Sequence, residues 1–262
     1  MAVRIAEILE CRRLGRSMRT YTLAIPEGMT WAGGANMKLG LFEGLDPTMG
    51  SRIKGCDLAT RQAESTRLTA ASFDPKYTRI VSISTRPQDG VVVFSTRIPD
   101  NPSIFKADLA TYEVGDSLFI LEVNNHLAVP TEGPLVLLTQ GVGLSSMHAF
   151  IRDLLEKGNE GPIICVNVVE PVEELRDLMV SDDRVQYIFK SNRYAFEQTV
   201  QTLLNDNEIK THSRFVVLGG HGFMKQWIHE LRIAGIEDER IFIDRLDAQR
   251  SIYFPELKDS NE

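Results

Sequence analysis

The sequence predicts an α/β plus β protein, in which an antiparallel Greek-key β-barrel is followed by a doubly wound parallel α/β domain. Three observations predict this class. Short alternating strands dominate the first half of the chain, apolar strands and helices alternate in the second half, and a segment with two prolines and a glycine (residues 128–134) separates them. We therefore expect two domains, residues 1–130 and residues 131–262, the second ending in a C-terminal tail.

Six short segments of the first half are expected to be β-strands, because their hydrophobic residues often alternate and turn residues separate them. Gln88-Asp89-Gly90 is a hairpin signal between two of these strands. One short helix, beginning at Ser103, is expected to interrupt them. The expected strands are Val3–Leu9, Met18–Ile25, Asn36–Leu41, Arg79–Arg86, Val91–Ile98 and Ser117–Val123.

The second half alternates between continuous apolar strands and amphipathic helices, which is typical of a parallel sheet covered on both faces. The expected strands are Leu135–Leu138, Ile163–Val169, Val185–Phe189, Phe215–Leu218 and Arg240–Ile243. The expected helices are one whose apolar face runs from Met147 to Leu155, and Val172–Met179, Phe196–Leu204 and Met224–Leu231.

The bulk composition argues against several classes of protein. A net charge of −7 disfavours broad binding to nucleic acid. No apolar run approaches the ~20 residues that span a bilayer, and Met1–Glu10 alternates and is charged, unlike a signal peptide, so we expect a cytoplasmic protein without a membrane span. Cys11, Cys56 and Cys165 form no CxxC pair, so we expect reduced thiols, no disulfide framework and no metal site.

Four arginines, Arg12, Arg13, Arg16 and Arg19, fall within one short early segment. They could dock an acidic partner protein. Equally, they could form the solvated tip of a hairpin, and this second interpretation is the more common outcome for such a charge run.

The segment Gly141-Val142-Gly143 opens a helix directly after a buried strand. Glycines at this position let the backbone turn tightly and approach a pyrophosphate, while the free N–H groups of the helix start face the anion. Ser145 or Ser146 is a candidate N-cap of the helix. A glycine pair also serves ordinary tight turns, but its place at the first strand-to-helix crossing favours nucleotide binding.

A second glycine cluster follows the apolar strand Phe215–Leu218 and precedes another helix; it reads Gly219-Gly220-His221-Gly222-Phe223-Met224. Two glycine-rich strand ends on one parallel sheet lie on the same carboxyl edge, where such sheets bind ligands. His221 could contact a phosphate or a ribose, although a lone loop histidine is more often solvated and inert.

The order of these features resembles the ferredoxin–NAD(P) reductase family over nearly the whole chain. The resemblance implies that the barrel binds FAD, or sometimes FMN, and that the second domain binds NADPH or NADH. Gly141–Gly143 matches the glycine turn that lies beneath the nicotinamide nucleotide in that family. Leu218–Met224 matches its Cys-Gly-Pro-Pro-x-Met-type loop, with Leu218 in place of the cysteine and without the prolines.

In the barrel, the family places an Arg-x-Tyr-Ser/Thr-x-x-Ser motif beside the flavin. The resemblance assigns it to residues 66–72, where Thr69 and Ser72 match the hydroxyl positions, Leu68 replaces the stacking aromatic, and Arg67 stands one place late. Thr69 is then the candidate catalytic residue, hydrogen-bonded near flavin N5. A Tyr253-Phe254 pair could cover the flavin in place of the missing aromatic, or could pack as a tail against the core.

The residues after the fifth expected strand resemble the family segment in which a serine at a short helix start holds the FAD pyrophosphate. Ser103 matches that serine, Phe105 follows it in the helix, and Arg97 or Lys106 adds positive charge. Ser103 is equally consistent with a plain N-cap.

The sequence gives conflicting signals on NADPH against NADH. Glu170, at a strand end, could accept hydrogen bonds from the adenosine ribose and repel a 2′-phosphate, which favours NADH. Ser191 and Arg193 resemble the Ser-Arg segment with which NADPH-using relatives hold the 2′-phosphate. Solvated loop charges remain the alternative for both, and the balance favours NADPH slightly.

The resemblance implies an oxidoreductase that passes a hydride from NAD(P)H to FAD and electrons on to an acceptor such as ferredoxin or flavodoxin. The alternative is a reductase-like nucleotide-binding or regulatory subunit without turnover, because fold does not guarantee activity. A dehydrogenase without flavin would leave the strand-rich first half unexplained.

Overall fold

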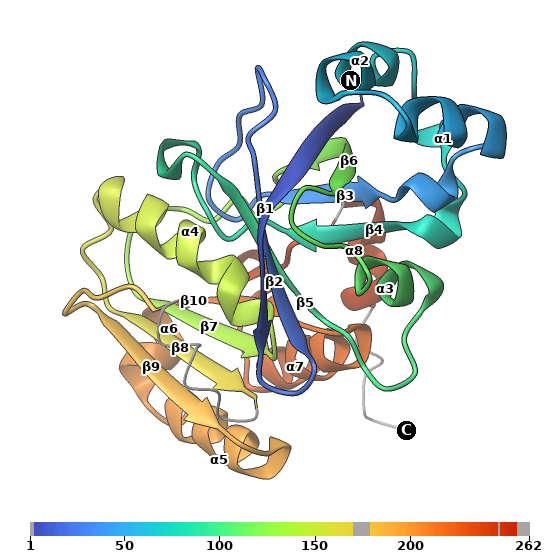
Figure 1. The fold of residues 1–262 in the computed structure, drawn as a ribbon. Helices are drawn as coiled ribbons and strands as arrows, with labels where there is room; N and C mark the ends of the chain where they lie inside the picture. Colours follow the sequence, from blue (N-terminus) through green and yellow to red (C-terminus); the bar gives the residue numbers. More distant parts are fainter. Residues whose placement is uncertain (1–2, 170–178, 246, 256–262) are drawn as a thin grey trace. The chain divides into compact units, whose positions relative to one another are not determined.

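The computed structural model describes residues 3–169, 179–245 and 247–255 (Figure 1). The chain divides into two compact units, which are described separately. The first contains Met1–Asn125 and Ser145–Phe150; the second contains His126–Leu144 and Ile151–Glu262. Within the described residues, no helix combines the length and the apolarity needed to cross a lipid bilayer.

The first unit is built on an antiparallel sheet with the strand order β4-β3-β6-β1-β2-β5, which confirms the predicted Greek-key class and all six predicted strands. β4 and β5 are the two edge strands of this sheet. The Ser84 N–H, just after β4, donates to Val93 O in β5 (2.7 Å), so a backbone hydrogen bond connects the two edges. The strands are β1 (Arg4–Leu14), β2 (Met18–Leu23), β3 (Asn36–Gly40), β4 (Thr78–Ser82), β5 (Val92–Arg97) and β6 (Ser117–Asn124).

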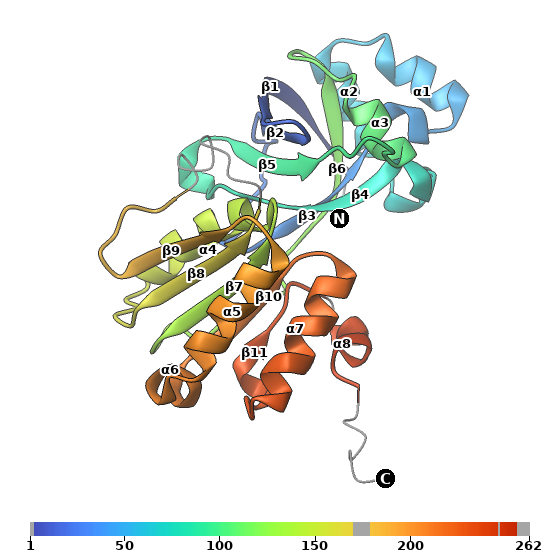
Figure 2. The ribbon, with the colours of Figure 1, turned by 90° about the horizontal axis from the view of Figure 1, so that it is seen from below.

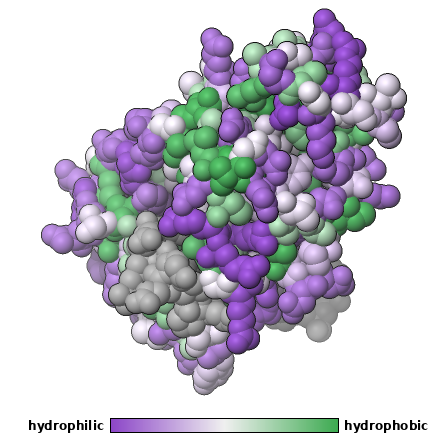
Figure 3. Space-filling model, in the orientation of Figure 1, coloured by the Kyte–Doolittle hydropathy of each residue, from purple (hydrophilic) through white to green (hydrophobic). Residues whose placement is uncertain are grey.

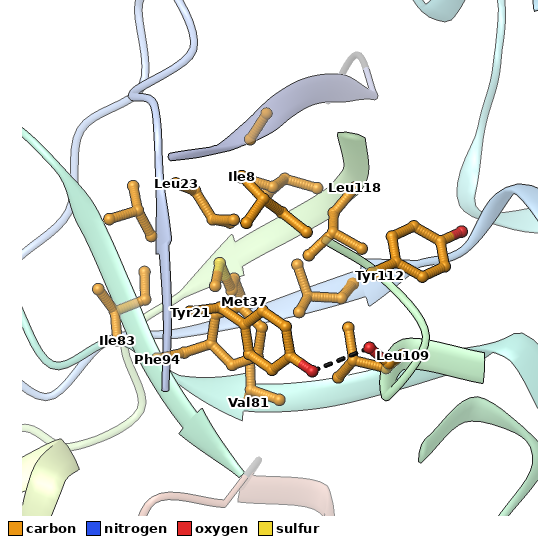
Figure 4. Close-up of a cluster of buried hydrophobic side chains, with 14 of the residues drawn as sticks. Ile8, Tyr21, Leu23, Met37, Val81, Ile83, Phe94, Leu109, Tyr112 and Leu118 are labelled. Atoms are coloured by element: carbon orange, nitrogen blue, oxygen red, sulfur yellow. Dashed lines mark hydrogen bonds between the residues drawn. The ribbon is translucent and has the colours of Figure 1, made fainter. Parts of the chain in front are cut away.

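The core of the barrel lies between these strands and the short helix α3 (Ile104–Leu109) (Figure 4). The rings of Tyr21 and Phe94 stack at 5.1 Å between centroids. The Tyr21 hydroxyl donates to the Leu109 carbonyl (2.8 Å), so the buried phenol is satisfied and α3 is tied to β2. Burial raises the pKa of Tyr21 to about 12.

Two further helices, α1 (Pro47–Lys54) and α2 (Leu58–Ser65), lie between β3 and β4, where the sequence analysis expects none. Asp46 and Asp57 cap them by accepting backbone N–H groups, and Pro47 occupies the first turn of α1. They cover a small second core that includes Ile53, Leu68, Phe73 and Phe119.

The second unit contains a parallel sheet with the order β11-β10-β7-β8-β9. The first strand along the chain, β7, is central; the chain adds strands on one side of it and then, at β10, on the other, which makes a doubly wound sheet as predicted. The strands are β7 (Leu135–Gln140), β8 (Ile163–Val168), β9 (Val185–Lys190), β10 (Arg214–Leu218) and β11 (Ile241–Phe242).

Helices cover both faces of this sheet: α4 lies on one face, and α5 and α7 on the other (Figure 2). The Phe196 ring of α5 meets the Trp227 ring of α7 edge-on at 5.0 Å. The helix expected at Val172–Met179 falls on residues 170–178, outside the described part of the chain. The helices are α4 (Gly143–Glu156), α5 (Arg193–Leu204), α6 (Asn207–His212), α7 (His221–Ile233) and α8 (Asp247–Tyr253), of which α6 and α8 were not expected.

Candidate functional site

In the second unit, the two glycine clusters lie at the carboxyl ends of β7 and β10, which are neighbours in the sheet. These are the strands between which the winding reverses, and open α/β sheets bind ligands in the crevice at such a point. The two predicted glycine clusters are therefore brought together, although 78 residues separate Gly141 from Gly219 in the sequence.

The first loop turns at Gly141, whose φ of +58° is a left-handed conformation that favours glycine. Its N–H donates to Val168 O (3.0 Å) at the end of β8. Val142 occupies the N-cap position of α4, where its side chain offers no acceptor, and Gly143 is the first residue of the helix. Ser145 and Ser146 lie inside the helix, so the prediction that one of them is its N-cap is wrong. A Cβ on Gly143 would lie 3.4 Å from Leu218 O, so a small residue suits the close approach of the β10 end.

The second loop is joined to the first, because Gly220 N donates to Gln140 Oε1 (3.2 Å). A Cβ on Gly219 would lie 2.6 Å from Phe223 Cδ1, so this position admits only glycine without rearrangement. Gly222 has open space around it, whereas Phe223 and Met224 are buried core residues of α7 and support the loop from below.

His221 Nδ1 lies 3.1 Å from the Tyr253 hydroxyl. Tyr253 belongs to the core of the second unit, and Phe254 packs under the Arg250 guanidinium at 4.1 Å. Of the two interpretations of this aromatic pair, packing of the tail against the core therefore describes what the structure shows.

At the carboxyl end of β9, Ser191 and Arg193 are exposed at the start of α5. Asn192 between them caps the helix by accepting the Ala195 N–H (2.9 Å). Glu170, the competing signal, lies outside the described residues.

In the first unit, basic side chains gather around Ser103. Arg79 Nη2 donates to Ser103 Oγ (3.1 Å), and Lys106 Nζ donates to Arg97 O (2.5 Å). Burial lowers the pKa of Lys106, and the neighbouring charges of Arg79 and Arg97 lower it further. The charges of Arg79 and Arg97 thus bear on Lys106, and an anion next to these side chains would be attracted by all three. Phe105 is 1% exposed and anchors α3 in the core.

The barrel residues predicted at 66–72 make contacts that do not involve the cluster around Ser103. Arg67 pairs with Glu64 (3.3 Å), and the Thr69 N–H donates to Ser72 Oγ (3.1 Å) within one 3-10 turn. None of these described contacts reaches Ser103. Leu68 is 2% exposed and packs in the second core, so its side chain offers no surface for a flavin ring.

Arg79, which sequence analysis missed, is the residue that the structure adds to the site. The stretch Arg79-Ile80-Val81-Ser82 on β4 follows the Arg-x-Tyr-Ser spacing with the arginine and serine in place, and Val81 where the aromatic would stand. Arg79 lies on β4, whereas residues 66–72 follow the end of α2 at Ser65 and include the 3-10 turn Ala70–Ser72.

Solved structures of redox flavoproteins share this fold. A ferredoxin NADP+ reductase from Neisseria gonorrhoeae with bound FAD and NADP is 14% identical, with a TM-score of 0.67 over 93% of this chain and 98% of that one. The ferredoxin reductase in carbazole 1,9a-dioxygenase is 14% identical, with a TM-score of 0.67 over 97% of this chain and 70% of that one. Phthalate dioxygenase reductase is 12% identical, with a TM-score of 0.62 over 92% and 67%. The sequence itself matches no protein-family model and no curated protein.

Proposed function

We propose that this chain, which has the fold of ferredoxin–NADP reductase-type flavoproteins, is an NAD(P)H-dependent flavin oxidoreductase. The observation that carries the proposal is the meeting of two glycine loops where the winding of the parallel sheet reverses. The left-handed turn at Gly141 and the crowded Gly219 leave backbone, rather than side chains, at the carboxyl edge. A dinucleotide diphosphate requires such close access to backbone N–H groups.

FAD fits the basic cluster of the first unit. Arg79 and Ser103 would hold its phosphate oxygens, because a guanidinium beside a hydroxyl suits a phosphate. Arg97 and Lys106 would add positive charge, and a phosphate would offset the repulsion that Arg97 exerts on Lys106. When bound, the flavin supplies the redox chemistry, taking a hydride from NAD(P)H and passing electrons on, while the chain binds and orients both cofactors.

We further propose NADPH as the preferred donor and an acceptor of ferredoxin or flavodoxin type. Ser191 and Arg193 are both exposed at the carboxyl end of β9, on the same sheet edge as the glycine loops. An exposed guanidinium and hydroxyl there would bind a 2′-phosphate. The ferredoxin reductases that share the fold make an iron–sulfur or flavin protein the natural class of acceptor to test.

The test is spectroscopic. The purified protein should be yellow, should release FAD on denaturation, and should be bleached anaerobically by NADPH faster than by NADH. Dithionite serves as the control that reports flavin reduction without the dinucleotide site. A colourless protein that also fails to take up added FAD would refute the proposal.

A second candidate is a nucleotide-binding subunit without turnover. It is favoured by one observation: Leu68 and Val81, the two positions where the motif would supply an aromatic, are both aliphatic and buried. The same experiment separates the two functions, because this subunit would bind dinucleotide in calorimetry yet show no reduction of flavin by NADPH.

A further inference from the structure

Two polar side chains are buried beneath the Gly141 turn. Thr139 on β7 and Asn167 on β8 stand opposite each other in register and are 0% and 1% exposed. Asn167 Nδ2 donates to Thr139 Oγ1 (2.6 Å) and to Gly141 O (3.3 Å). Because polar groups are costly in the interior of a parallel sheet, this pair requires a reason beyond packing.

The direction of the Asn167 amide is fixed by its partners. Gly141 O can only accept, so the NH2 group must face it. The amide oxygen is then left buried, and it finds no hydrogen-bond partner in the part of the chain that the structure describes. A buried acceptor without a partner is unfavourable, so any stabilisation that Asn167 provides must come from the two hydrogen bonds donated by its NH2 group.

One of these hydrogen bonds stabilises the turn at Gly141. Gly141 is held on both sides: its N–H donates to Val168 O and its carbonyl accepts from Asn167. The two bonds fix the peptide planes that flank a left-handed residue and so set the direction of the N–H groups that follow at Val142 and Gly143. We propose that Asn167 is a positioning residue that holds this turn in the geometry required by a dinucleotide diphosphate; this rests on the proposed function.

The test compares ligands with and without the diphosphate bridge in Asn167→Leu. Calorimetry should show about tenfold weaker binding of NADP+, as expected for one lost hydrogen bond to the turn. Binding of 2′,5′-ADP, which lacks the bridge, should change by less than about twofold. If the wild type prefers NAD+, AMP is the matching fragment. FAD retention and reduction by dithionite should be unchanged.

Asn159→Leu is the matched control. Asn159 is also fully buried in the second unit and donates its amide to a glycine carbonyl, Gly161 O (2.8 Å), but before β8 rather than at its carboxyl end. It should lower the melting temperature without weakening NADP+ binding by more than about twofold. Should Asn167→Leu not fold, Asn167→Asp, which replaces the donor by an acceptor at the same size, should give the same ligand-selective loss.

Equal loss of both ligands in Asn167→Leu, or loss no greater than in Asn159→Leu, would overturn the positioning role while leaving the proposed function standing. A wild-type protein that binds no dinucleotide would refute both.

Discussion

Arg79 shows how one guanidinium can organise an anion site. It reaches from an edge strand, β4, to the serine that precedes α3, and its charge acts on Lys106. Arginine offers planar, paired donors that suit phosphate oxygens, so lysine would be a poor substitute here. We therefore assign Arg79, and not Arg67 of the motif predicted at residues 66–72, to the flavin phosphates.

We predict that Arg79→Ala weakens FAD binding by one to two decades, because hydrogen bonds to charged groups contribute about 1.5–3 kcal/mol. Retention of FAD through dialysis and fluorescence titration of the apoprotein measure this. Arg67→Ala is the control: Arg67 is exposed and pairs with Glu64, so its loss should leave FAD affinity unchanged. If Arg67→Ala has the larger effect, the flavin site lies at residues 66–72 after all.

Arg193 is predicted to discriminate between the two dinucleotides. Arg193→Ala should slow flavin reduction by NADPH at least tenfold while changing the rate with NADH by less than about twofold, since only NADPH carries the 2′-phosphate. Stopped-flow rates over a range of each donor provide the measurement. Similar losses with both donors would move Arg193 away from the 2′ position.

At the scale of elements, the strands were predictable and the small helices were not. Frequent alternation in the strands of the first unit reflects burial on one face, and the continuous apolar runs of β7, β8 and β10 reflect burial on both faces. In contrast, Ile53 is the one buried residue of α1, and α2 buries only Ser65. Such helices show no helical repeat of apolar residues, and the only sequence signals for them are their N-cap residues and Pro47.

The site was predictable in part for the same reason. Glycine loops announce themselves after apolar strands, so both were found from the sequence. For the flavin motif we now propose β4 in place of residues 66–72, because hydroxyls and arginines occur in both segments and only Arg79 meets Ser103. The sequence could not reveal that the Leu68 side chain packs in the second core, or that Arg79 donates to Ser103, 24 residues away.

The second glycine loop yields a prediction about stability. Gly219→Ala should destabilise the protein by about 1–3 kcal/mol, because the new Cβ would lie 2.6 Å from Phe223 Cδ1 in a packed core. Gly222→Ala, in the same loop but with open space, should stabilise the first turn of α7 by about 0.4–1 kcal/mol. Urea unfolding of both variants tests this. Equal changes in the free energy of unfolding would mean that the loop and Phe223 rearrange at no cost to admit the new Cβ.

Across the whole molecule, charge is divided unevenly. Residues 1–125 carry 15 basic and 14 acidic residues, whereas residues 126–262 carry 14 and 22. Hydrophilic side chains cover much of the face seen in Figure 3, with hydrophobic atoms in separate patches. On the β1–β2 hairpin, Arg13 stands directly opposite Arg19, an arrangement that like charges disfavour. Arg12 pairs with Glu10, and Arg19 donates to Ala110 O.

We expect Arg13 and Arg16, both exposed near the hairpin turn, to attract an acidic protein acceptor. The double substitution R13E/R16E should slow electron transfer to such an acceptor at least tenfold at low salt, with the difference shrinking as salt is raised. Ferricyanide, a small acceptor, should show no comparable loss. A wild-type rate that does not depend on salt would mean that these arginines are solvated and do not attract the acceptor.

The place of β1 in the sheet has a consequence for how the barrel is made in the cell. β1 pairs with β2, which follows it within a few residues, but its other neighbour is β6, about 100 residues further on. While the chain leaves the ribosome, that edge of β1 waits without a partner until β6 emerges. Arg4 and Glu7 stand on this edge, and charges on an open strand edge discourage pairing with another chain. Replacing both by threonine should therefore leave the finished protein folded but raise the share that aggregates during synthesis.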